Sequence, residues 1–138
     1  MMMMRSIAVM TLCILLFLVA GCGSGDVTVT GQLYRQGELY KPEQGEQVMV
    51  VFEELKDGQP TGKAFPTRLS ADGSFKIAGP DNTGIKAGSY RVGVSSRPEV
   101  PVPGQPMADK FQGAYDSSKS PLKYDITPSS RNIKVELP

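Results

Sequence analysis

Apolar and polar residues alternate in short runs along most of the chain after residue 26. In residues 27–34, Val27, Val29 and Leu33 fall on one face, and threonines occupy the other. Such a period of two is typical of a half-buried β-strand. The pattern recurs along the chain and predicts six or seven short strands. Their expected ranges are 27–34, 47–55, 64–69, 75–77, 90–94, 122–126 and 133–137.

Two of these runs depart from simple alternation. Residues 47–55 are apolar on both faces, since Met49 and Val51 lie opposite Val48, Val50 and Phe52. A strand that is covered on both faces is expected in the middle of a sheet. Residues 64–69 contain Pro66, which has no N–H to donate to a neighbouring strand, so this run is expected at a sheet edge.

The segments between the runs are rich in glycine and proline. Residues 35–46 are predicted to form a long loop. Residues 98–106 hold four prolines and are expected to be extended, partly polyproline-like, and unable to enter a sheet interior. No helical periodicity follows residue 26. We therefore expect residues 27–138 to form an all-β domain, a single small β-sandwich.

The first residues form a separate segment. Residues 7–20 are apolar except for Thr11, and the basic Arg5 precedes them. An apolar run of about 14 residues suits a signal peptide and is shorter than the roughly 20 that cross a bilayer. Residues 1–21 are therefore predicted to be a cleaved signal peptide.

The end of that run, Leu18-Val19-Ala20-Gly21-Cys22, resembles the lipobox of bacterial lipoproteins. The resemblance implies cleavage between Gly21 and Cys22 and fatty acylation of Cys22. Cys13 leaves with the leader, so no disulfide partner remains; an unmodified thiol and an uncleaved anchor are the alternatives. Residues 22–26 would be a short tether, whose four residues before Asp26 reach only ~14 Å when extended. The domain would then lie close to lipid.

The composition limits the chemistry of this domain. The chain has 15 basic residues, including Arg5 of the leader, and 14 acidic ones, so the mature net charge is close to zero. A neutral surface argues against nucleic acid as a partner. There is no histidine, and Cys22 is the one cysteine after the leader, so the usual catalytic triads and zinc sites lack their residues.

The remaining candidates for chemistry are weak. Residues 117–120, Ser-Ser-Lys-Ser, offer the groups for serine–lysine catalysis, but they are interpreted as a solvated loop. Glu53 and Glu54 are neighbours on one strand and would point to opposite faces. Asp72-Gly73 and Asp81-Asn82 suit turns better than calcium loops. We therefore predict a non-catalytic domain with no metal and no cofactor.

Binding is the alternative use of such a domain. The proline-rich loop, with Phe111 and Tyr115, could present a peptide- or carbohydrate-binding surface, or it could be a rigid connector that crosses between the sheets. Tyr34, Tyr40 and Tyr115 could stack on sugars or cover sheet edges. If the strands run antiparallel at full height, the 35–46 loop, the Asp72-Gly73 turn and the proline-rich loop should share the end away from residue 26.

The order of motifs resembles a known group, the small lipoproteins of planctomycete-type bacteria with a carboxypeptidase regulatory-like, transthyretin-like domain. The matching segments span nearly all of the mature chain: residues 21–23, 27–31, 50–52, 71–75, 87–92, 120–122 and 132–137. The resemblance implies a transthyretin-like (prealbumin-like) sandwich, lipid-anchored at the cell envelope, with a structural or accessory role and an envelope protein or glycan as partner. The long segment 35–46 departs from the group, where a short turn usually joins the first two strands.

Overall fold

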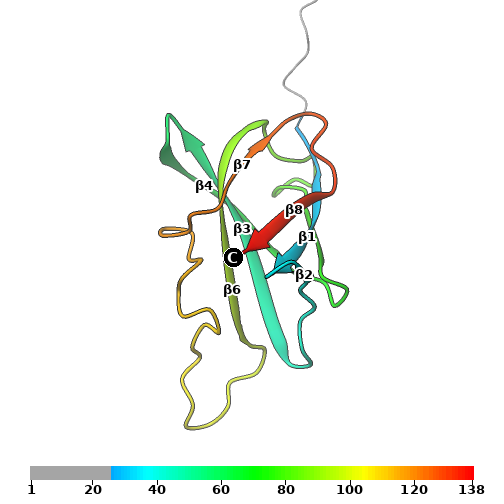
Figure 1. Ribbon diagram of the computed structural model, residues 1–138. Helices are drawn as coiled ribbons and strands as arrows, with labels where there is room; N and C mark the ends of the chain where they lie inside the picture. The colour runs from blue at the N-terminus through cyan, green and yellow to red at the C-terminus, as the bar shows by residue number, and fades with distance from the viewer. Residues whose placement is uncertain (1–25) are drawn as a thin grey trace, which may run out of the picture.

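A computed structural model describes residues 26–138, and these residues form eight β-strands and no helix (Figure 1). None of them belongs to a helix that is long and apolar enough to cross a membrane. The strands, in chain order, are β1 (Val29–Arg35), β2 (Glu38–Leu39), β3 (Glu46–Lys56), β4 (Gln59–Arg68), β5 (Ser74–Ile77), β6 (Gly88–Pro98), β7 (Lys123–Ile126) and β8 (Ile133–Leu137).

The strands form two four-stranded sheets. In the second sheet the order is β4-β3-β6-β7, and every pair is antiparallel. In the first sheet β1 is central. It pairs with β5 and β2 in antiparallel fashion and with β8 in parallel fashion. Gly31 pairs with both Phe75 of β5 and Ile133 of β8, so β5 and β8 lie along opposite edges of β1.

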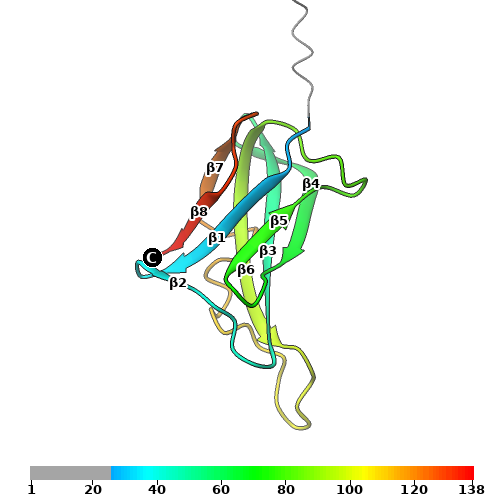
Figure 2. The same ribbon diagram turned by 90° about the vertical axis from the view of Figure 1, so that its right-hand side faces the viewer.

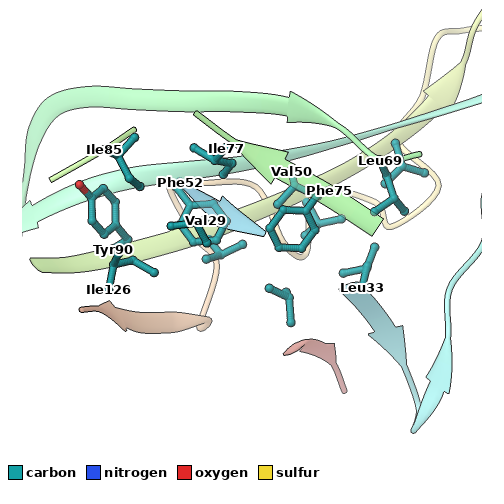
Figure 3. Close-up of a cluster of buried hydrophobic side chains, with 14 of the residues drawn as sticks. Val29, Leu33, Val50, Phe52, Leu69, Phe75, Ile77, Ile85, Tyr90 and Ile126 are labelled. Atoms are coloured by element: carbon teal, nitrogen blue, oxygen red, sulfur yellow. The ribbon is translucent and has the colours of Figure 1, made fainter. Parts of the chain in front are cut away.

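The core lies between the two sheets and explains the alternation in the sequence. Val29 and Leu33 of β1 are fully buried, as are Val50 and Phe52 of β3, and these side chains meet in the space between the layers (Figure 3). Gly31 shares their face, and a Cβ there would lie 2.6 Å from the Phe75 ring. The all-β, sandwich-like fold expected from the sequence is therefore what residues 26–138 adopt.

Tyr90 is the largest side chain that is completely buried. Its hydroxyl donates a hydrogen bond of 2.7 Å to the Lys86 carbonyl, which satisfies the polar end of the ring. Burial, together with the nearby carboxylates of Glu54 and Asp26, raises the pKa of Tyr90 to about 12. This tyrosine therefore stays protonated and acts as a core residue.

The strands follow the order of the sequence patterns, but two are longer than expected: β4 begins at Gln59, and β6 runs from Gly88 to Pro98. A larger difference lies in residues 35–46. That segment is not one long loop: the chain turns at Gln36 and Gly37, which both have positive φ, and returns as the two-residue strand β2. A two-residue turn with positive φ at both positions suits the twist of a hairpin. This extra strand makes the total eight, where six or seven were expected.

The edge strand β4 contains Pro66 at the position that a sheet tolerates. The Leu69 amide donates to the Val48 carbonyl at 2.8 Å. Counting back along β4, the backbone N–H and C=O groups of every second residue therefore point toward β3, and those of the residues between them point away from it. Pro66 is one of the outward positions, where its missing N–H breaks no bond to β3. The edge position expected for this run is confirmed, since β4 pairs with β3 alone.

The two ends of the sandwich differ in what they carry. Figure 2 shows the segment before β1, in blue, at one end of the sandwich, while the loops after β2, β4 and β6 lie at the other. Hydrogen bonds connect these loops to the sheets and to each other: Leu33 N donates to Gly73 O at 3.0 Å, and Glu99 N donates to Gly45 O at 2.8 Å. The prediction that the three segments share the end away from residue 26 is confirmed.

Candidate interaction surface at the loop-bearing end

The connection between β6 and β7 dominates this end of the molecule. It leaves β6 after Pro98 and reaches β7 at Lys123, and both strands belong to the same sheet. The alternative that it crosses between the sheets is therefore wrong. Its two halves differ: residues 99–108 are exposed, whereas residues 109–122 lie along β6. We call the first half the projecting loop and the second half the strap.

The strap continues the sheet where β7 ends. Backbone hydrogen bonds join Lys110 N to Ser96 O (2.8 Å), Val94 N to Tyr115 O (2.8 Å) and Val92 N to Leu122 O (2.9 Å). These bonds satisfy the β6 groups that β7 does not reach. Gly93 makes room for the strap, because a Cβ on it would lie 2.8 Å from the Ser117 backbone nitrogen.

Asp109 fixes the start of the strap. One carboxylate oxygen accepts hydrogen bonds from Ser96 N (2.8 Å) and Phe111 N (3.1 Å), and the other accepts from Gly113 N (3.0 Å). Phe111 is then buried, with the rings of Tyr40 and Tyr115 packed edge-on against it at centroid distances of 5.9 and 5.8 Å. Phe111 and Tyr115, considered from the sequence as part of a binding surface, thus anchor the strap to the domain.

A second cluster forms around Glu46, at the first residue of β3. Its carboxylate accepts hydrogen bonds from the hydroxyls of Ser96 and Tyr40 and from Glu43 N, and the Lys110 ammonium lies 3.7 Å away. Burial raises the pKa of Glu46, but the hydrogen bonds and Lys110 outweigh it, so the pKa lies below its usual value. The ionised carboxylate therefore connects the sheet to the strap.

The Tyr40 and Lys110 side chains respond to the same cluster. Burial and the Glu46 carboxylate raise the pKa of Tyr40, and the hydrogen bond to Tyr40 raises the pKa of Lys110. Both groups stay protonated at neutral pH. Glu46, Ser96 and Lys110 were not singled out from the sequence; the available signal was a serine at an inward position of β6, where the alternation calls for an apolar residue.

The projecting loop has its base held on both sides. On the β6 side, Glu99 N donates to Gly45 O, and the Glu99 carboxylate pairs with Arg68 at 2.9 Å. On the other side the Asp109 bonds begin. Between them the loop exposes large apolar side chains: Val100 at 71%, Val102 at 45% and Met107 at 42% exposure. These three side chains make the projecting loop the most apolar exposed segment of residues 26–138 and the candidate contact surface of this end.

Two shallow hollows flank the base of the loop and share the segment 43–46. The larger, about 640 Å³, continues to Arg68, Ser70 and Glu99; the smaller, about 320 Å³, continues to Ser96 and Lys110. Both are open and lined by mixed charges. Their lining suits contact with a protein surface better than enclosure of a small molecule.

The residues considered for catalysis have structural contacts. Ser120 is buried, donates to Val92 O at 2.5 Å and accepts from Leu122 N, so its assignment to a solvated loop is wrong. Ser118 donates to Asp116 at 2.6 Å. Glu53 pairs with Arg91 at 3.1 Å, whereas Glu54 accepts from Thr61 at 2.9 Å. The two glutamates therefore have separate partners.

The residues considered for calcium lie in turns. Asp72 accepts from the amide and hydroxyl of Ser74 at 3.0 and 2.6 Å, and these bonds lower its pKa. Asn82 has positive φ in the loop before β6, next to Asp81. Within residues 26–138, no three Asp, Glu, His or Cys side chains gather as a metal site would require.

The three tyrosines considered for sugar stacking, Tyr34, Tyr40 and Tyr115, each contact another part of the domain. The Lys134 ammonium lies 4.3 Å from the centre of the Tyr34 ring. For Tyr40 the corresponding distance to the Lys110 ammonium is 5.5 Å, and the Tyr115 hydroxyl donates to the Pro138 carbonyl at 3.1 Å. These tyrosines cover the sheet and the strap.

Gly21 and Cys22, predicted as the cleavage and lipid-attachment residues, lie outside the described residues.

Comparison with known proteins gives little further information. No family model matches the sequence, and no curated protein is similar to it. One solved structure, a DUF3823 family protein from Bacteroides ovatus, aligns with 80% of this chain at 17% identity and a TM-score of 0.40. The aligned part covers 44% of that protein's length.

Proposed function

We propose that this protein is a lipoprotein of the bacterial cell envelope, anchored through acylated Cys22, whose β-sandwich is a non-catalytic interaction module. The observation that carries the proposal is the segment Leu18–Cys22, which ends an apolar run of signal-peptide length in the lipobox pattern. Two or three acyl chains, as the lipoprotein resemblance implies, anchor a protein far more firmly than a single chain does.

The arrangement of the domain supports the interaction role. The segment that leads into β1 and the loop-bearing end lie at opposite ends of the sandwich (Figure 2). A tether at Cys22 would hold the Asp26 end near lipid and direct the projecting loop away from the membrane. The catalytic candidates Ser118, Ser120 and the two glutamates are engaged in intramolecular bonds. A transthyretin-like domain of the envelope lipoprotein group is the fold we propose for this sandwich.

The anchor is tested by metabolic labelling with radioactive palmitate, comparing the native chain with Cys22→Ala. We expect label on the native protein and none on the variant, and mass spectrometry should find a diacylated or triacylated residue 22 at the mature amino terminus. Ser24→Ala serves as the matched control and should label normally. Equal labelling of both chains, or a retained leader, would refute the proposal.

A further inference from the structure

The outer face of the first sheet is polar across its centre. Figure 2 shows β8, β1 and β5 side by side on this face. Alternate residues of β1 are buried in the core, so Thr30, Gln32 and Tyr34 point outward. The residues in register with the first two are also polar: Lys76 opposite Thr30, and Ser74 and Lys134 opposite Gln32. The centre of the face thus presents hydroxyl, amide and ammonium groups.

A shallow hollow of about 540 Å³ lies over this face. The polar side chains that line it come from three segments: Thr30 and Gln32 from β1, Ser74 and Lys76 from β5, and Asn132 from the turn before β8. Alternate residues of a strand are about 7 Å apart and neighbouring strands about 5 Å, so these side chains cover about 7 by 10 Å. Pockets that enclose small molecules are mostly apolar, whereas this open, polar hollow suits a hydrated ligand that lies across the sheet.

Internal hydrogen bonds leave the donor ends of two side-chain amides free. Thr30 Oγ1 donates to Asn132 Oδ1 at 3.0 Å, and the Tyr34 hydroxyl donates to Gln32 Oε1 at 3.2 Å. Each bond occupies the amide oxygen, so the NH₂ groups of Gln32 and Asn132 are left to donate. Within residues 26–138 neither NH₂ group has a hydrogen-bond partner, and the Lys76 ammonium has none either.

The charges of the face favour an anion. Lys76 and Lys134 are exposed and lie on the two strands that flank β1. The carboxylate of Glu136 accepts a backbone N–H at 2.7 Å and pairs with Lys134 at 3.5 Å. Asp72, at the margin, accepts two hydrogen bonds from Ser74. A ligand for this face is therefore expected to supply acceptors, with at least one negative charge among them.

From these features we propose that the outer face of the first sheet, centred on Gln32, binds a polysaccharide whose sugar units carry carboxylate groups. The ligand carboxylate accepts from the Lys76 ammonium, and the hydroxyl oxygens of the sugar accept from the Gln32 and Asn132 amides. Bridging water completes such contacts at an open surface. The inference goes beyond the anchor and the loop-bearing end, because none of these residues belongs to either.

A phosphate polymer is the other polyanion that lysine attracts, and the hollow lacks the group that recognises phosphate best. Arginine binds phosphate through two parallel N–H donors in a fixed fork. No arginine lines this hollow. A single ammonium beside two neutral amides matches one carboxylate among several hydroxyl groups. The observations therefore favour an acidic polysaccharide over a nucleic acid or polyphosphate.

The test is calorimetric titration of the full chain, purified from cells in detergent, with hexagalacturonate. Two comparison ligands are its methyl ester, which has the same sugar units without the charge, and a hexamer of single-stranded DNA. The test variant combines Gln32→Ala with Lys76→Gln. The control variant combines Gln59→Ala with Lys56→Gln, which removes the same two kinds of group from the exposed turn between β3 and β4.

We expect the native chain to bind hexagalacturonate, and to bind it more weakly as ionic strength rises, because Lys76 and Lys134 are exposed. The test variant should lose at least about tenfold in affinity, which corresponds to one hydrogen bond to a charged group. The control variant should bind as the native chain does. Tyr34→Phe should cost about threefold, because Gln32 then loses the hydrogen bond that orients its amide.

Nuclear magnetic resonance of the native chain follows the same titration and needs no substitution. Backbone amide shifts are expected in residues 30–34, 74–76 and 132–134, and not in the projecting loop. Thermal unfolding of each variant shows whether a loss of affinity comes from a loss of the fold.

Four results would overturn the inference: no binding by the native chain, equal affinity for the methyl ester or the DNA hexamer, equal effects of the test and control variants, or shifts confined to residues outside this face. The outcome is separable from that of the anchor. An unlabelled Cys22 with the expected binding would refute lipidation alone, and a labelled Cys22 without binding would refute the polysaccharide site alone.

Discussion

The projecting loop and the strap are two halves of one connection, and they show how different the roles of similar sequences can be. Both lack strand alternation, and both are rich in turn residues. Three kinds of contact hold the strap to the sheet: the buried ring of Phe111, three backbone hydrogen bonds to β6, and the hydrogen bonds of the Asp109 carboxylate. The projecting loop is hydrogen-bonded to the rest of the domain at its base alone, and it exposes its apolar residues. The difference teaches that backbone bonding and burial separate a structural segment from a binding one.

The strongest way to break this contrast is to remove the aromatic anchor of the strap. Phe111→Ala is expected to lower the free energy of unfolding by about 3–5 kcal/mol, because a buried ring leaves a cavity among Tyr40, Tyr115 and Arg35. Denaturant unfolding measures it. The control, Val102→Ala in the projecting loop, should change stability by less than about 0.5 kcal/mol. Equal effects would refute the distinction between the halves.

The next largest effect is expected where the strap crosses β6. Gly93→Ala places a Cβ 2.8–2.9 Å from the Ser117 backbone, so the strap must shift, at a cost of about 1–3 kcal/mol. Gly104→Ala is the control in the projecting loop: it meets no atom and is strained by φ alone, with a cost of about 1 kcal/mol. Chemical denaturation compares them. A smaller loss for Gly93→Ala than for Gly104→Ala would contradict the packing described for the strap.

A more moderate effect is expected at the charged link. Glu46→Gln should cost roughly 1–2 kcal/mol at neutral pH, since the hydrogen bonds from Ser96 and Tyr40 lose their charged acceptor. Because folding lowers the pKa of Glu46, its contribution is present above the unfolded pKa and disappears as pH falls through the folded value. Urea unfolding between pH 7 and pH 3 should therefore show a weaker pH dependence in the variant. Glu43→Gln, whose side chain is mostly exposed, is the control and should follow the native curve.

The smallest effect on stability is expected from substitutions in the projecting loop. Replacing Val100, Val102 and Met107 together by serine should change the free energy of unfolding by less than about 0.5 kcal/mol, because these side chains are exposed. A large loss of stability would mean that the projecting loop packs on the domain in solution.

How far the sequence predicts the fold depends on whether a segment is held by apolar burial or by hydrogen bonds. Where apolar burial dominates, as from Val48 to Phe52, the unbroken apolar run predicted both the strand and its central place in the sheet. Strand β2 escaped prediction because two residues carry no period, although Gln36-Gly37 was a turn signal. The strap escaped because backbone bonds and the Asp109 cap hold it, and neither leaves a pattern of apolar positions. Ser96 interrupts the alternation of β6 at the inward position where it meets Glu46.

The absent N–H of Pro66 has a consequence for crowded surroundings. Growth of cross-β aggregates requires an uninterrupted row of donors and acceptors along an exposed strand. On β4 that row is interrupted at Pro66. On β5, the neighbouring edge strand of the other sheet, the Lys76 carbonyl already accepts a hydrogen bond of 2.9 Å from the Thr67 hydroxyl. Two copies that met at this margin would therefore not join their sheets into a continuous one. At high local concentration, contact along this margin is expected to leave the domains separate.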